Sequence, residues 1–143
     1  MTGKNISIGV IDGQGGGIGS EIIKRLREEV SLELDIVALG TNAMATAAMM
    51  KAQANRGASG ENAILYSVNS LHIIVGSWAI ITANSMMGEI SPRIAAAISS
   101  SKAQKLLLPL KMEGCQLVGY VSQPFPHLIG ELIAKIKKIL ESA

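Results

Sequence analysis

Five glycines within eight residues constrain this chain more than any other feature. The run Asp12-Gly13-Gln14-Gly15-Gly16-Gly17-Ile18-Gly19 follows an apolar segment, residues 6–11, that is typical of a short buried strand. Apolar residues then recur at helical spacing, namely Ile18, Ile22, Ile23, Leu26 and Val30. Glycines permit positive φ and carry no Cβ, and the following helix offers free N–H groups and the positive end of its dipole to an anion. The order of strand, glycine loop and helix therefore predicts a phosphate site at residues 13–19.

The spacing of the glycines excludes two common kinds of nucleotide-binding loop. A nucleoside-triphosphatase loop needs a lysine and then Ser or Thr directly after its final glycine, whereas Ser20 and Glu21 follow Gly19, so ATP or GTP hydrolysis is not expected. The pattern G-x-G-x-x-G, begun at Gly13, requires glycine where Ile18 stands. The actual spacing, G-x-x-x-G-I-G, resembles the cofactor loop of the short-chain dehydrogenases. This resemblance implies that the loop holds the pyrophosphate of NAD or NADP.

The proton-transfer pair of those dehydrogenases, Tyr-x-x-x-Lys, is absent from this sequence. Tyr66 is followed four positions later by Ser70, and Tyr120 by Pro124. Without the lysine neither tyrosine is prepared to transfer a proton, so the resemblance extends to the loop and not to the chemistry.

Charge and spacing around the loop also depart from a dinucleotide site. Asp12 and Glu21 flank the loop, and a diphosphate would be repelled by both carboxylates unless a cation or an arginine intervened. The acidic residue that binds ribose hydroxyls about 20 residues after such a loop is missing, because Gly40, Thr41 and Asn42 occupy the end of the expected second strand. The loop therefore predicts phosphate binding but does not identify the ligand.

Three motifs occur in order along the chain: I-D-G-Q-G-G-G-I-G at residues 11–19, A-L-G-T-N-A-x-A-T at 38–46 and N-R-G-A-S-G-E-N at 55–62. Together they resemble a bacterial Rossmann-like family catalogued as a domain of unknown function. The resemblance spans nearly the whole length and implies the fold, but it brings no activity with it.

Length and composition exclude several classes of protein. The 143 residues suit one Rossmann-like domain, residues 1–143, with no separate substrate domain. Aromatic residues make up only 3% and the net charge is +2, so nucleic acid is not an expected partner. The uncharged stretch 62–88 contains too many polar residues for a membrane span. The single cysteine, Cys115, excludes an internal disulfide and favours a cytoplasmic location, and we expect it to be a small buried residue of a strand.

Alternating strand and helix patterns predict an α/β, three-layer Rossmann-like fold with a mostly parallel sheet of about five strands. The expected strands cover residues 6–11, 33–39, 71–75, 106–110 and 117–121. After the first helix, further helices are expected from Ala43, from Ser59 or Gly60, from Ser91-Pro92, and along the apolar stripe Ile129 to Leu140. Residues 63–68 fit either a helix or a strand, and Gly88 is expected to end another helix.

Loops at the carboxyl ends of parallel strands are the favoured ligand positions. Thr41 and Asn42 are candidates for binding a ribose or phosphate and also fit a simple helix cap, and Ser77 follows the third strand. Residues 55–62 are expected to form a long polar loop over the site. In it, Arg56 is either a two-pronged anion clamp or part of a surface ion pair.

Several other polar residues fit more than one role. Asn84 and Ser85 fit a ribose contact or ordinary backbone contacts, and Glu61 and Glu89 would act as general bases only if buried near the site. The two histidines lack neighbouring ligands at metal-binding spacing, so no metal site is expected. Five methionines and the alanines around the second helix fit core packing or a homo-oligomer interface; the methionines are Met44, Met49, Met50, Met86 and Met87.

Two functional hypotheses follow. The first is a nucleotide or dinucleotide binder, with NAD(P) or another nucleotide as ligand, phosphate over Gly13 to Gly19, and ribose near Thr41 and Asn42. The alternative is a small enzyme acting on a phosphorylated or carboxylated metabolite, with Arg56 holding the anion and Asp12 or Glu61 transferring a proton.

Overall fold

A computed structural model describes residues 6–30 and 33–142, and five strands alternate with helices along them. The strands form one sheet in the order β3-β2-β1-β4-β5, and every neighbouring pair is parallel. The expected α/β, Rossmann-like architecture is therefore confirmed. In chain order the elements are β1 (Ser7–Asp12), α1 (Gly17–Glu29), β2 (Asp35–Gly40), α2 (Ala43–Lys51), β3 (Arg56–Ser59), α3 (Glu61–Ser67), the 3-10 turn η1 (Val68–Ser70), β4 (Ile73–Ser77), the 3-10 turn η2 (Trp78–Ile81), α4 (Pro92–Ser100), β5 (Gln104–Leu108) and α5 (Phe125–Ser142).

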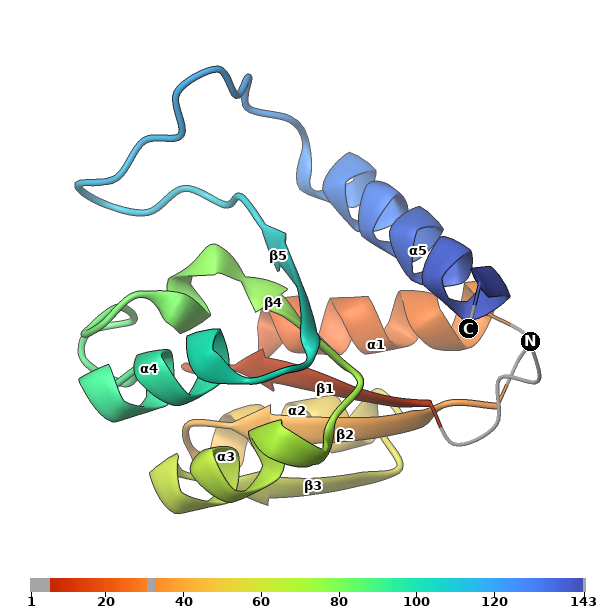
Figure 1. The fold of residues 1–143 in the computed structure, drawn as a ribbon, viewed down its shortest axis with the longest axis horizontal. Helices are drawn as coiled ribbons and strands as arrows, with labels where there is room; N and C mark the ends of the chain where they lie inside the picture. Colours follow the sequence, from red (N-terminus) through yellow and green to blue (C-terminus); the bar gives the residue numbers. More distant parts are fainter. Residues whose placement is uncertain (1–5, 31–32, 143) are drawn as a thin grey trace.

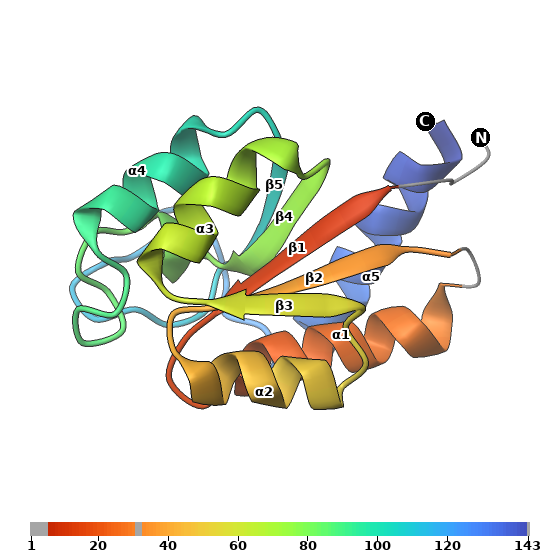
Figure 2. The same cartoon turned by 90° about the horizontal axis from the view of Figure 1, so that it is seen from below.

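Helices cover both faces of the sheet (Figures 1 and 2). Helices α1, α2 and α5 lie on one face, and α3 and α4 lie on the other. Successive strand side chains point to opposite faces, so both faces of the central strand are apolar: Ile8 and Val10 join one core cluster and Ile11 joins the other.

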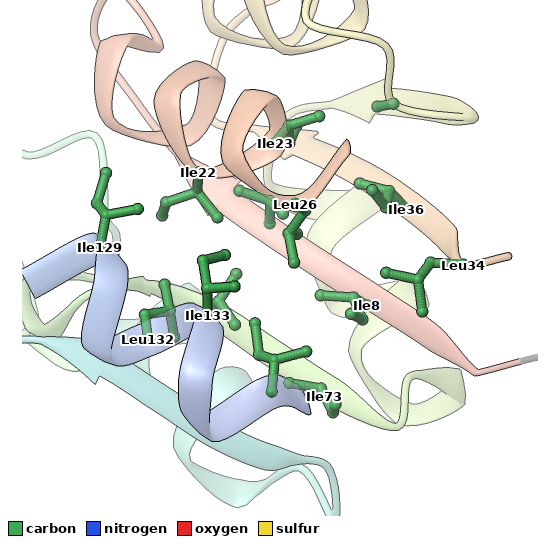
Figure 3. Close-up of a cluster of buried hydrophobic side chains, with 14 of the residues drawn as sticks. Ile8, Ile22, Ile23, Leu26, Leu34, Ile36, Ile73, Ile129, Leu132 and Ile133 are labelled. Carbon is green, nitrogen blue, oxygen red and sulfur yellow. The ribbon is translucent and has the colours of Figure 1, made fainter. Parts of the chain in front are cut away.

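The larger cluster fills the space between the sheet, α1 and α5 (Figure 3). Ile22 and Leu26 of α1 lie opposite Ile129 and Ile133 of α5, above Ile8 of β1. All five side chains are almost fully buried, and burying each one contributes roughly 1.5–3 kcal/mol. This packing holds α1, and therefore the loop at its N-terminus, firmly against β1.

The order of the strands locates the crevice where ligands bind in such sheets. From β1 the chain moves outward through β2 to β3, then crosses back to β4 on the other side of β1 and continues to β5. The connections after β1 and β4 therefore leave in opposite directions, and a crevice opens at the carboxyl ends of these two strands. Both the glycine loop and Ser77 lie at this edge.

One expected loop is in fact a strand. Residues 55–62 contain β3, whose register with β2 runs from Val37 opposite Arg56 to Gly40 opposite Ser59. All four residues of β3 are exposed, and the sequence R-G-A-S has no apolar alternation. The expectation of a polar loop was therefore wrong. This edge strand forms through backbone pairing with β2 and not through burial of its side chains, so no apolar pattern indicates it.

One expected strand does not form. Between β5 and α5, residues 109–124 make a long connection that loops away from the sheet in Figure 1, with one isolated bridge between Met112 and Cys115. Val118 and Val121 are exposed, and Gly119 has φ of 85°. The strand expected at residues 117–121 was wrong, and Cys115 is exposed, not buried. The total of five strands still holds because β3 replaces it.

The expected helix ending at Gly88 is also wrong. The single turn η2 is followed by consecutive turns in which Asn84, Met86, Met87 and Gly88 all have positive φ. The alternatives left open for residues 63–68 are settled in favour of helix, since α3 and η1 contain them. Among the described residues, no helix is both long enough and apolar enough to cross a membrane.

Candidate functional site at the carboxyl edge of the sheet

The glycine loop turns the chain from β1 into α1 within four residues. The N–H of Gly16 donates to the carbonyl of Gly13 over 2.9 Å, and both Gln14 and Gly16 have positive φ, 50° and 75°. Gly16 is also the N-cap of α1, where a Cβ would lie 2.7 Å from the carbonyl oxygen of Ala45 in α2. Only glycine fits at position 16 on both counts.

Asp12 supplies a carboxylate of the chain itself to the N-terminus of α1. Its side chain is only 4% exposed, with Oδ1 accepting from the N–H of Gly13 over 2.8 Å and Oδ2 from the N–H of Gly19 over 2.7 Å. Burial raises the pKa of Asp12, while the backbone N–H groups of Gly19 and Gly13 oppose that rise, and the charge of Glu89 adds to it. Asp12 therefore takes up one of the free N–H groups at this helix end, that of Gly19, which could otherwise bind an anion.

The five glycines of the loop divide into two groups. Gly13, Gly16 and Gly19 are tightly packed, because a Cβ at any of them would come within 3 Å of neighbouring atoms. Among the described residues, and apart from chain neighbours and the backbone of α1 itself, a Cβ at Gly15 or Gly17 would meet no atom within 4 Å, and neither residue has positive φ. Internal packing thus accounts for three glycines, and two border open space.

A carboxylate from a distant segment joins the glycine loop to the end of β2. Oε1 of Glu89 accepts from the N–H of Gln14 over 2.8 Å, the hydroxyl of Thr41 over 2.6 Å and Nδ2 of Asn42 over 3.0 Å. Asn42 also caps α2, because its Oδ1 accepts from the N–H of Ala45 over 2.8 Å. These bonds lower the pKa of Glu89, with the Gln14 N–H as the largest cause. We call this arrangement the Glu89 bridge.

The Glu89 bridge was not anticipated from the sequence, which offered Glu89 only as a conditional general base. Glu89 lies 75 residues from Gln14 and 47 from Asn42, with no spacing motif between them. The bridge also accounts for Gly13, where a Cβ would lie 2.7 Å from Oγ1 of Thr41 and 2.8 Å from Oε1 of Glu89.

A cleft of about 570 Å³ opens beside the loop, over the carboxyl ends of β1 and β4. Ser77 is one of its lining residues, and its Oγ accepts from the N–H of Ala79 over 3.1 Å. Lys111 supplies a positive charge to the lining. The cleft is lined by Asp12, Gln14, Ile18, Ser77, Ala79, Asn84, Ser85, Met86, Met87, Leu110, Lys111, Met112 and Glu113.

The structure does not bring Arg56 to this edge. Arg56 begins β3, at the amino end of the sheet, and pairs with Asp35 through Nη2 and Oδ2 at 2.7 Å. Glu61 lies at the start of α3 and contacts Ser91 and Arg93 of the α4 region, so it is not part of the glycine loop. The site therefore combines residues 12–19 with Thr41, Asn42, Ser77 and Glu89, and leaves Arg56 and Glu61 outside.

Among the described residues, no group of three or more His, Cys, Asp or Glu side chains is arranged to hold a metal ion.

A parallel sheet in this order, with a glycine loop between its central strand and the first helix, defines a Rossmann-like protein. The model of the family described as Domain of unknown function (DUF3842) matches residues 7–141, and the chain belongs to this family. The resemblance drawn from the three motifs is thus confirmed. No curated protein and no solved structure matches the chain.

Proposed function

We propose that this chain binds a nucleotide whose phosphates lie over residues 15–17 and the first turn of α1. The observation that carries the proposal is the open space at Gly15 and Gly17. Glycine costs conformational entropy, and here neither packing nor positive φ requires it. A ligand that approaches the backbone at these two positions is a physical reason for their lack of side chains.

The cleft supports the same proposal. Its volume of about 570 Å³ falls within the usual range for small-ligand sites of roughly 300–1,000 Å³. Lys111 supplies positive charge to the lining, against the carboxylates Asp12 and Glu113 that line the same cleft and would otherwise repel a phosphate. Ser77 offers a hydroxyl to the part of the ligand beyond the phosphates. The proposed ligand class is a nucleotide, ranging from NAD(P) to a simpler nucleotide.

A valine at position 17 tests the proposal. In Gly17→Val the side chain enters open space, so we expect the fold to persist while the side chain blocks the approach of phosphate. Thermal unfolding is measured with and without NAD, NADP, ADP, ATP and inorganic pyrophosphate. We expect at least one nucleotide to raise the melting temperature of the wild type, and Gly17→Val to lose that rise.

Gly130→Val is the matched control. Gly130 also lies in a helix, α5, and among the described residues the only atom outside that helix that its Cβ would meet is Nη2 of Arg25 at 3.6 Å. This variant should keep the full ligand-induced rise. A wild type that responds to no nucleotide, or a Gly17→Val protein that responds as the wild type does, would show the proposal to be wrong.

A further inference from the structure

The Glu89 carboxylate is held in one position by donors from three separate segments of chain. The backbone N–H of Gln14, the hydroxyl of Thr41 and the amide of Asn42 all converge on Oε1. A carboxylate fixed in this way requires little further ordering when a ligand binds to it.

The second oxygen of this carboxylate remains available. Among the residues that the structure describes, none donates a hydrogen bond to Oε2 of Glu89, and the side chain is partly exposed. Because the bonds to Oε1 favour the charged form, Glu89 is an acceptor only and presents Oε2 lone pairs to a donor from outside the chain.

The position of this acceptor relative to the glycine loop indicates what it would bind. In nucleotide sites of this architecture, an acidic residue at the end of the second strand accepts the ribose hydroxyls while the phosphates lie over the loop. Here β2 ends in Gly40, and no carboxylate follows it at Thr41 or Asn42. Glu89 reaches that place from another segment and is bonded to both of those residues.

The backbone leading to Glu89 has an unusual conformation. Asn84, Met86 and Met87 have φ of 65°, 55° and 57°, and Gly88 has φ of 89°. Each left-handed residue other than glycine is unfavourable, and such residues persist where the surrounding structure holds them. The Glu89 bridge is the polar anchor that joins this segment to the glycine loop.

We propose that Glu89 accepts hydrogen bonds from the ribose 2′- and 3′-hydroxyls of the ligand, so that the site selects nucleotides with an unmodified ribose over those carrying a 2′-phosphate. This inference rests on the proposed nucleotide binding. A vicinal diol supplies two donors to a fixed carboxylate, whereas a 2′-phosphate would bring negative charge against it.

Glu89→Gln tests this proposal with ADP, 2′-deoxy-ADP, adenosine 2′,5′-bisphosphate and inorganic pyrophosphate as probes. The amide oxygen of glutamine can take the place of Oε1, so the bridge to Gln14, Thr41 and Asn42 is retained while the acceptor at Oε2 becomes a donor. By titration calorimetry the wild type should bind ADP about tenfold or more tightly than 2′-deoxy-ADP, since a bond to a charged group is lost. In Glu89→Gln this ratio should fall toward one, the 2′,5′-bisphosphate should bind more tightly than in the wild type, and pyrophosphate should be unchanged.

Glu28→Gln, on the exposed side of α1 and away from the site, removes the same charge and should retain the wild-type ratios. Three outcomes overturn the proposal. If Glu89→Gln keeps the wild-type preference for ADP over 2′-deoxy-ADP, Glu89 is not the ribose acceptor, although nucleotide binding stands. If Glu89→Gln binds every probe more tightly, pyrophosphate included, the carboxylate competes with phosphate. If the wild type binds no nucleotide at all, the proposed function fails together with this inference.

Discussion

Single residues in the glycine loop have separate physical reasons for being glycine. Gly16 combines a left-handed backbone with close contact to Ala45, whereas Gly15 has neither restriction. From the sequence, the five glycines look equivalent, because a pattern of letters does not distinguish a glycine required by packing from one that borders open space.

Gly16→Ala should therefore destabilise the protein. An alanine at φ of 75° costs about 1–2 kcal/mol, and its Cβ would lie 2.7 Å from the Ala45 carbonyl oxygen. We expect the melting temperature to fall by roughly 5 °C or more in scanning calorimetry without ligand. Gly15→Ala is the control and should change the free energy of unfolding by no more than about 0.5 kcal/mol. Equal effects of the two substitutions would contradict this division of the glycines.

The candidate site was only partly predictable at this scale. The loop, Thr41, Asn42 and Ser77 were identified because each directly follows a recognisable strand, and the structure brings all of them to one edge of the sheet. Glu89 was not assigned to the site, since it reaches the loop only through a run of left-handed residues that no periodicity reveals. Arg56 looked like an anion clamp because its neighbours are glycines, yet it pairs with Asp35 on an edge strand.

Among the elements, those with a strong apolar pattern or a cap were predicted well. The stripe of α5 and the Ser91-Pro92 start of α4 match the structure. The errors concern β3, residues 117–121 and the helix expected to end at Gly88. Strand β3 is exposed and forms through backbone bonds to β2, whereas residues 117–121 are apolar but pair with no strand of the sheet. The apolar pattern failed in both segments, because β3 pairs although all its residues are exposed, and residues 117–121 are apolar yet mostly exposed and unpaired.

Ser91→Ala tests the capping of α4. Oγ of Ser91 accepts from the N–H of Ile94 over 3.1 Å and also contacts Glu61, so the hydroxyl joins the starts of α3 and α4. Loss of an N-cap typically costs about 1 kcal/mol, and we expect at least that loss in urea unfolding. Ser99→Ala, on the exposed side of the same helix, should stay within about 0.5 kcal/mol of the wild type. If both variants unfold at the same urea concentration as the wild type, the cap contributes nothing.

The stability of the whole molecule depends on pH through two carboxylates at the loop, and their effects have opposite signs. The pKa of Glu89 is lowered from 4.5, so its contribution is present above pH 4.5 and is lost as pH falls through the folded-state pKa. The pKa of Asp12 is raised from 3.8, so the folded protein holds that proton longer and stability falls as pH rises from 3.8 through the folded-state pKa. The two effects overlap in acid and partly offset each other.

Comparison of Glu89→Gln with the wild type separates the two contributions. The wild type should be the more stable protein at pH 7, and its advantage should shrink as pH falls below about 4.5, because Glu89 is then protonated in the unfolded chain while the folded protein still holds it charged, until pH passes the lower folded-state pKa. Thermal unfolding from pH 7 to pH 3 measures this difference, with Glu28→Gln as the control. A difference that stays constant over this range would show that the charge of Glu89 does not stabilise the bridge.

The Glu89 bridge also has a consequence for the order in which the chain folds during synthesis. Its donors belong to the first 42 residues, and its acceptor follows Asn42 by 47 residues. A chain emerging from the ribosome therefore presents β1, the loop, α1 and β2 before the carboxylate exists. Contacts so distant along the chain form late, since a long loop must first close. A partly synthesised chain thus carries an incomplete site, and Glu89 joins it only after much of the sheet has been made.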